Sequence, residues 1–146
     1  MTPPIRMDRT IPALPVRSAS EAVDFYRERL GFDVLHHDGG FAVVGRDEAV
    51  VHLWEASDDG WRNRADLIER PVCSGAESFL AGTASFRVRV SSVDDVDRLY
   101  EELRAADVLH GVSTDGPTDT DFGTHEFAAL DLDGNLIGFF TWVDGR

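Results

Sequence analysis

The residues with the clearest chemical potential lie together in one short stretch of the second half of the chain. Asp119 and Asp121 lead into Phe122 and Gly123, so an aromatic ring follows two carboxylates where glycine gives the backbone freedom. The ring offers a surface for stacking, and the carboxylates attract positive charge. The sequence therefore predicts a binding site for a flat, cationic ligand at this stretch.

Signals for nucleophilic catalysis are weak by comparison. Cys73 has no evident histidine partner in its sequence context, and no serine lies in a recognisable nucleophile elbow. We therefore expect binding and no covalent catalysis.

The strands that must position this site follow directly. Between Phe122 and Phe140 two apolar runs flank Asp131-Leu132-Asp133-Gly134-Asn135, and Asp-Gly between strand-like segments favours a hairpin. We predict two adjacent antiparallel strands, at residues 125–131 and 136–143.

The first half of the chain predicts one strand, one helix and three further strands. Pro12 and Pro15 confine the first strand, residues 11–16, to the edge of a sheet. Ser18 or Ser20 caps the helix, which Gly31 ends. Turns then separate three strands at residues 32–37, 41–46 and 49–55.

The second half repeats this order. At an offset of 74 residues, Val16 falls on Val90, Ser18 on Ser92 and Tyr26 on Tyr100. A helix at 93–106 and a strand at 108–113 complete a second βαβββ unit with the hairpin above. One helix on one sheet buries a face poorly, so we expect the units to pair. The predicted fold is α+β, one domain over residues 1–146 with units at 10–55 and 83–143.

The charge of the chain argues against some partners. Fourteen basic residues, all arginine, stand against 27 acidic ones, for a formal net charge of −13. Nucleic acid is therefore an unsuitable partner, since a phosphate backbone rewards clustered positive charge. No basic residue lies between Arg104 and Arg146, while eight acids do. This acidic stretch is either a solvated surface or a field that attracts a cation.

Two features bear on the cell compartment. The chain has no apolar run long enough to cross a bilayer, and its N-terminus lacks the apolar region of a signal peptide. A single cysteine suits a reducing compartment. We expect a cytoplasmic protein with no membrane partner.

The 56–82 segment between the units is longer than most loops within a domain. It carries Trp61 and three arginines, and residues 66–69 could form one short helix before Pro71. Trp61 either contacts a ligand or pins the loop to the body of the protein.

The paired βαβββ units, the helix ending Phe25-Tyr26-Arg27-Glu28-Arg29-Leu30-Gly31-Phe32 and the Asp131–Asn135 turn resemble the vicinal oxygen chelate superfamily, and within it the bleomycin resistance proteins. The resemblance covers nearly the whole chain outside the N-terminal arm and the 56–82 segment. The superfamily contains metal-dependent lyases, transferases and dioxygenases as well as metal-free binding proteins, so fold alone does not give function.

The resemblance implies where a catalytic metal would be held. The matching positions are Pro12 or a neighbour, His52, Ser85 and Gly138, and only His52 can ligate a metal. A metal site would need His125 or Glu126 beside His52. We therefore expect no metal, no other cofactor and no enzymatic activity.

The resemblance also implies aromatic rings that sandwich a flat ligand and acidic groups that receive its charged tail. The matching residues are Asp38 and Phe41 at a turn, Trp54 on a strand, and Phe122-Gly123, where the family has Trp-Gly. The loss of the indole N–H at Phe122 leaves the identity of the ligand open. Phe41 and Trp54 also have the alternative of core packing.

The predicted function is sequestration of a bleomycin-type or similar flat cationic antibiotic in a groove between two subunits. The predicted ligand-binding residues are Asp38, Phe41, His52, Trp54, Trp61, Asp119, Asp121, Phe122 and Gly123. The family resemblance implies a homodimer that can exchange N-terminal strands. The alternatives are a metal-dependent enzyme of the same superfamily and a metal-free binder of another natural product.

Overall fold

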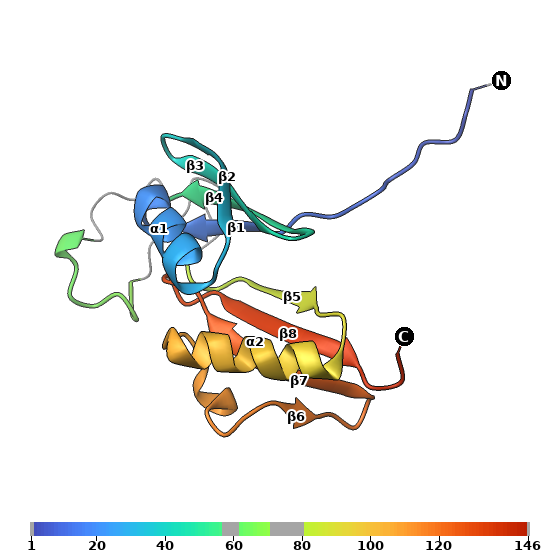
Figure 1. Ribbon diagram of the computed structural model, residues 1–146. Helices are drawn as coiled ribbons and strands as arrows, with labels where there is room; N and C mark the ends of the chain where they lie inside the picture. Colours follow the sequence, from blue (N-terminus) through green and yellow to red (C-terminus); the bar gives the residue numbers. More distant parts are fainter. Residues whose placement is uncertain (1, 57–61, 71–80, 146) are drawn as a thin grey trace.

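Two similar units make up the described chain. The computed structural model describes residues 2–56, 62–70 and 81–145, and Figure 1 shows each unit as one sheet with one helix. The first unit contains β1 (Ala13–Val16), α1 (Ala19–Arg29), β2 (Asp33–Asp38), β3 (Phe41–Arg46) and β4 (Ala49–Glu55). The second contains β5 (Ser85–Arg89), α2 (Val93–Ala105), the 3₁₀ helix η2 (Gly111–Ser113), β6 (Thr118–Asp119), β7 (Thr124–Leu130) and β8 (Leu136–Trp142). The predicted α+β fold of two βαβββ units is confirmed.

The two sheets have the same topology. Their strand orders are β1-β4-β3-β2 and β5-β8-β7-β6. In each, the first strand pairs parallel to the last and the other neighbours are antiparallel. The edge position predicted for the first strand is confirmed, since β1 lies at one end of its sheet. An edge suits this strand because proline lacks the N–H donor that a central strand would need.

Serine caps begin both helices. The Ser18 hydroxyl accepts from the N–H of Glu21 at 3.3 Å, and the Ser92 hydroxyl accepts from the N–H of Asp95 at 3.1 Å. Gly31 follows α1 with φ +75°, a left-handed conformation that suits glycine. Of the two predicted caps for the first helix, Ser18 is therefore the one used.

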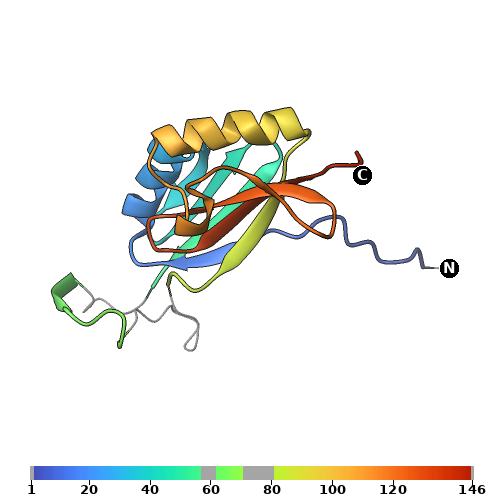
Figure 2. The same ribbon diagram turned by 90° about the horizontal axis from the view of Figure 1, so that it is seen from below.

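One core lies between the helices and the sheets. Alternate residues of β3 and β4, such as Val44 and Leu53, face α1, while Phe127 and Phe139 belong to the same buried cluster near α2. Figure 2 shows both α helices on the same side of the two sheets. The residues between the buried ones in these strands therefore face away from the helices, and we call these surfaces the open faces.

Two predicted elements are wrong. Residues 108–113 form no strand: the chain makes one isolated bridge at Leu109 and then turns into η2, where the His110 ring accepts from the N–H of Val112. The Ser113 hydroxyl accepts from the N–H of Ala128, so a side chain takes the place of a ladder bond. The second strand of this unit is instead the short β6. Residues 66–69 form a turn, in which the N–H of Arg70 donates to the carbonyl of Asp66.

No helix within the described ranges has both the length and the apolar character that crossing a membrane requires.

Candidate ligand-binding surfaces

The open face of the first sheet gathers aromatic side chains. Phe41 and Trp54 are paired residues on β3 and β4, and His52 lies two residues before Trp54 on the same face. The rings of Phe41 and His52 meet edge to face, with centroids 5.4 Å apart. All three side chains are exposed or half-buried, whereas their neighbours Val51 and Leu53 are buried. Neither Phe41 nor Trp54 therefore belongs to the buried core cluster.

A β-bulge adds a fourth ring to this face. Val34 pairs with the buried Val44, but His36 pairs with Val43, so the register shifts between them and His36 faces outward. Its ring centroid is 6.0 Å from that of Phe41. We call His36, Phe41, His52 and Trp54 the aromatic face.

The open face of the second sheet is polar. Arg87 on β5 pairs with Gly138 on β8, and its guanidinium lies over the ring of Phe140 at 4.5 Å. Arg87 Nη2 donates to Glu126 Oε2 at 2.7 Å, and the Thr124 hydroxyl donates to the same oxygen at 2.7 Å. The hydrogen bond from Arg87 holds the pKa of Glu126 below its usual value. We call Arg87, Thr124, Glu126 and Phe140 the polar face.

The implied metal positions do not fit a metal. His52 is next to Pro12, whose carbonyl accepts from the His52 N–H at 2.9 Å, but proline offers no side-chain ligand. Gly138 has no side chain, and a Cβ there would lie 3.4 Å from Arg87 Cγ. His125 bonds to aspartates and Glu126 to Arg87, so neither joins His52. Among the residues with described positions, no group of three or more His, Cys, Asp or Glu could hold a metal ion.

The β6–β7 turn carries the acidic site that the sequence emphasised. Phe122 is 57% exposed, and Gly123 follows with φ +97°. The carbonyl of Gly123 accepts from the N–H of Val143, which ties the turn to the end of β8. The Asp121 side chain is exposed.

His125 holds the acidic turn to helix α2. Its Nδ1 is 2.7 Å from Asp119 Oδ1, and its Nε2 is 2.7 Å from Asp97 Oδ1 on α2. Partial burial favours the neutral ring, but the hydrogen bonds and charges of the two carboxylates outweigh it and raise the pKa of His125. Asp119 is thus part of a structural bridge although its side chain is 75% exposed, and Asp121 is an exposed acid outside that bridge.

The predicted ligand-binding residues fall into two separate groups. Asp38, Phe41, His52 and Trp54 lie on the first sheet, with Asp38 and Phe41 flanking the β2–β3 turn. Asp119, Asp121, Phe122 and Gly123 belong to the β6–β7 turn, which lies at the opposite end of the molecule from the β2–β3 turn (Figure 1). Trp61 lies outside the described residues. A single chain therefore does not bring the two groups together.

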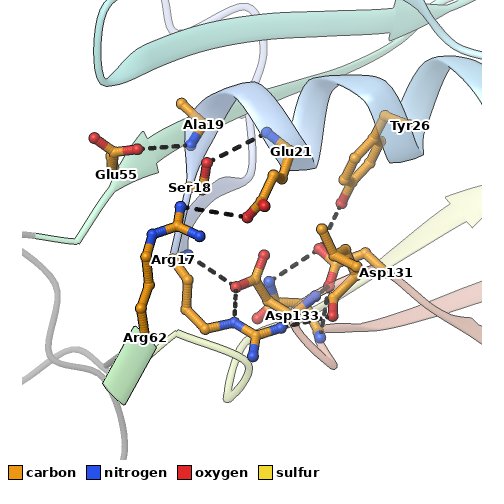
Figure 3. Close-up of polar contacts among 11 residues, drawn as sticks. Arg17, Ser18, Ala19, Glu21, Tyr26, Glu55, Arg62, Asp131 and Asp133 are labelled. Carbon is orange, nitrogen blue, oxygen red and sulfur yellow. Dashed lines mark hydrogen bonds and ion pairs between the residues drawn. The ribbon is translucent and has the colours of Figure 1, made fainter. Parts of the chain in front are cut away.

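The Asp131–Asn135 turn has a structural role that its hairpin signal did not reveal. Asp131 is 5% exposed and accepts from the Tyr26 hydroxyl at 2.9 Å and from Asn135 Nδ2 at 3.0 Å. Burial raises the pKa of Asp131, although the hydrogen bonds oppose that rise. Asp133 accepts from both the N–H and Nε of Arg17, each at 2.8 Å. Figure 3 shows these contacts joining the turn to Arg17, just before α1, and to Tyr26 on α1, so the turn fastens one unit to the other.

Four residues of the open faces were not predicted from the sequence to belong to a binding site. Arg87, Glu126 and Phe140 lie on predicted strands but meet only through strand pairing, and His36 needs the bulge. Alternation could have indicated that Glu126 and Phe140 share a face with Gly138. No sequence signal reports the bulge.

Known proteins resemble the chain in both sequence and structure. Residues 6–139 match the model of the Glyoxalase/Bleomycin resistance protein/Dioxygenase superfamily. Bleomycin resistance proteins of Geobacillus stearothermophilus and of Staphylococcus aureus are each 45% identical over 137 residues, 94% of this chain and 98% of theirs.

Solved structures share the fold at lower identity. A bleomycin-binding protein from Streptomyces verticillus, complexed with copper(II)-bleomycin, has a TM-score of 0.63 at 23% identity, over 92% of this chain and 96% of that one. Another bleomycin-binding protein, complexed with bleomycin, has a TM-score of 0.64 at 21% identity, over 92% and 98% of the two chains. By its family model and by these relatives, the chain belongs to the glyoxalase/bleomycin resistance protein/dioxygenase superfamily.

Proposed function

We propose that this protein binds a bleomycin-type antibiotic, or a similar flat cationic compound, and confers resistance by sequestration without chemical change. The observation that carries the proposal is the 45% identity to bleomycin resistance proteins over 94% of the chain. The exposed ring of Phe41 and the half-buried ring of Trp54 support it, because both offer stacking surface outside the core.

Acidic side chains are the second support for a cationic ligand. The chain has a net charge of −13, and Asp121 and Phe122 are exposed together at the β6–β7 turn. Acidic surroundings raise the association rate of a cation and select for its charge, while stacking contributes about 1 kcal/mol for each ring pair beyond area burial.

We propose further that the binding groove forms between two copies of the chain. A ligand that contacts both the aromatic face and the β6–β7 turn needs two chains, since the turns at these sites lie at opposite ends of one molecule (Figure 1). The N-terminal arm supports strand exchange: it projects from the body in Figures 1 and 2, and Ile5 and Met7 are 92% and 96% exposed. The proposed compartment is the cytoplasm, which suits a chain with one cysteine.

The proposal is tested by titrating the protein with bleomycin, with and without copper, and following tryptophan emission. We expect quenching at micromolar concentrations. The Phe41→Ala variant should bind about tenfold more weakly, because one stacking contact of about 1.4 kcal/mol is lost. Val93→Ala, a truncation on α2 away from the open faces, is the matched control and should bind like the wild type.

Absence of quenching in both metal-free and copper-loaded titrations would remove bleomycin as the ligand and leave another natural product. Metal analysis of the purified protein tests the enzyme alternative. Stoichiometric nickel, zinc, manganese or iron that His52→Ala abolishes would overturn the binding-only function.

A further inference from the structure

Arg87 is held rigidly at the centre of the polar face. Its guanidinium lies over Phe140 at 4.5 Å and donates through Nη2 to Glu126 at 2.7 Å. Its stem passes over Gly138, the residue paired with it, where a Cβ would lie in van der Waals contact 3.4 Å from Arg87 Cγ. Ring and carboxylate together fix the plane of the guanidinium, so little side-chain entropy remains to be lost on binding.

This fixed guanidinium keeps unused donors. Of its five N–H groups, two are directed at Glu126, and one of those is long, with Nη1 3.5 Å from Oε1. We find no acceptor for the other three in residues 2–56, 62–70 and 81–145. The side chain is 47% exposed and borders a hollow of about 430 Å³ on the open face, lined also by Glu126, Ala128 and Gly138.

Glu126 supplies an unused acceptor beside these donors. Its Oε2 already accepts from Arg87 and from the Thr124 hydroxyl, whereas among the described residues Oε1 receives only the long contact from Arg87 Nη1 at 3.5 Å. A donor group and an acceptor group thus lie next to each other at the edge of the hollow. A carboxamide matches that pair, because its carbonyl accepts from the guanidinium while its N–H donates to the carboxylate.

The charge of the protein favours a neutral group over an anion here. Arg87 and Glu126 cancel each other locally, and the chain as a whole carries −13, so a carboxylate would meet repulsion. A carboxamide satisfies both partners without adding charge.

We propose that Arg87 and Glu126 are specificity-determining residues that bind a planar carboxamide group of the ligand in the hollow of the second sheet. This inference rests on the proposed function and deepens it: the aromatic face takes the flat ring, the acidic turn takes the cation, and the polar face takes a neutral amide.

The direction in which one substitution changes the binding affinity distinguishes amide binding by Arg87 from an effect of its charge alone. Arg87→Met keeps the stem on Phe140 but removes every donor. If the ligand responded only to charge, the uncovered Glu126 would strengthen the binding of a cation. If Arg87 binds an amide, Arg87→Met should weaken bleomycin binding at least tenfold, and Arg87→Lys should recover only part of it, because an ammonium lacks the planar fork.

The matched control is Arg98→Met, which also removes an arginine paired with one acid, Asp95, but on the exposed side of α2. It should bind bleomycin like the wild type. Calorimetric titrations of the full-length proteins give the affinities, and circular dichroism confirms that each variant is folded. Equal or tighter binding by folded Arg87→Met overturns the proposal.

A second measurement works even when bleomycin is not a ligand. The Arg87 Nε–H signal in a ¹⁵N NMR spectrum is assigned by its loss in Arg87→Met, and the wild type is titrated with benzamide and with benzylamine at millimolar concentrations. Benzamide should shift the signal and benzylamine should not. If wild type binds no bleomycin, bleomycin is removed as the ligand, and the benzamide titration alone decides the amide site: an unmoved signal overturns it.

Discussion

The two units build the same frame from matching residues and then use their open faces differently. Ser18 and Ser92 cap equivalent helices, and Tyr26 and Tyr100 each meet a phenylalanine edge to face at 5.4 Å. On the open faces the match ends. His52, paired with Ala13, corresponds to Gly138, paired with Arg87. The first face is aromatic and the second is polar.

This difference distinguishes residues that maintain the packed core of each unit from residues whose type can differ between the units. A side chain that faces a helix must fit a packed core, so both units keep similar ones there. A side chain on an open face meets no such constraint. Duplication therefore provides two surfaces of one shape with different chemistry, and a ligand with unlike parts can use both.

The hydrogen bonds of the two tyrosines, Tyr26 to Asp131 and Tyr100 to Thr114, give the largest expected contrast. Asp131→Ala removes the acceptor for the Tyr26 hydroxyl, two backbone N–H groups and Asn135 Nδ2, all at 2.9 to 3.0 Å. Buried donors without partners are costly, so the free energy of unfolding should fall by about 3 kcal/mol or more. Urea denaturation measures it.

The two tyrosines provide the control for that change. Tyr26→Phe removes a bond to the buried Asp131 and should cost about 1.5 kcal/mol, while Tyr100→Phe removes a bond to the Thr114 carbonyl and should cost about 1 kcal/mol or less. If Tyr100→Phe destabilised the protein as much as Asp131→Ala, the special role of the first tyrosine in joining the units would be lost.

A smaller effect should separate the acids at the two turns. Asp121→Asn removes an exposed charge beside Phe122 and leaves the bridge between Asp119 and His125 intact. We expect the association rate for bleomycin to fall about threefold at low salt, with the loss shrinking as salt rises. Stopped-flow fluorescence measures the rate. Asp38→Asn at the β2–β3 turn is the partner variant, and equal rates for wild type and both variants would reduce these acids to a solubilising surface.

The smallest expected effect depends on pH and concerns His125 in the second unit. Asp97 and Asp119 raise the pKa of His125, so the protonated ring is favoured in the folded state. The extra stability is fully present below the ordinary histidine pKa of about 6.5 and is lost as pH rises through the folded-state value. His125→Gln should therefore destabilise the protein more at pH 6 than at pH 9. Thermal unfolding of both proteins across this range checks it, and a pH-independent difference would contradict it.

Local sequence signals predicted most of the fold. Serine caps, proline at the sheet edge and the Asp-Gly turn act over a few residues, and the 74-residue offset linked the units because both face the same packing problem. The prediction of a strand at 108–113 failed where side chains of His110 and Ser113 replaced backbone pairing.

The sequence by itself determined the two units, their caps and turns, the family resemblance and the types of residue that line the open faces. The tertiary structure decided which of them meet. The bulge turns His36 toward Phe41, strand pairing places Arg87 over Phe140, and packing of the units buries Asp131 against Tyr26. These contacts join residues far apart in the chain, and they depend on register and packing, which no local pattern specifies.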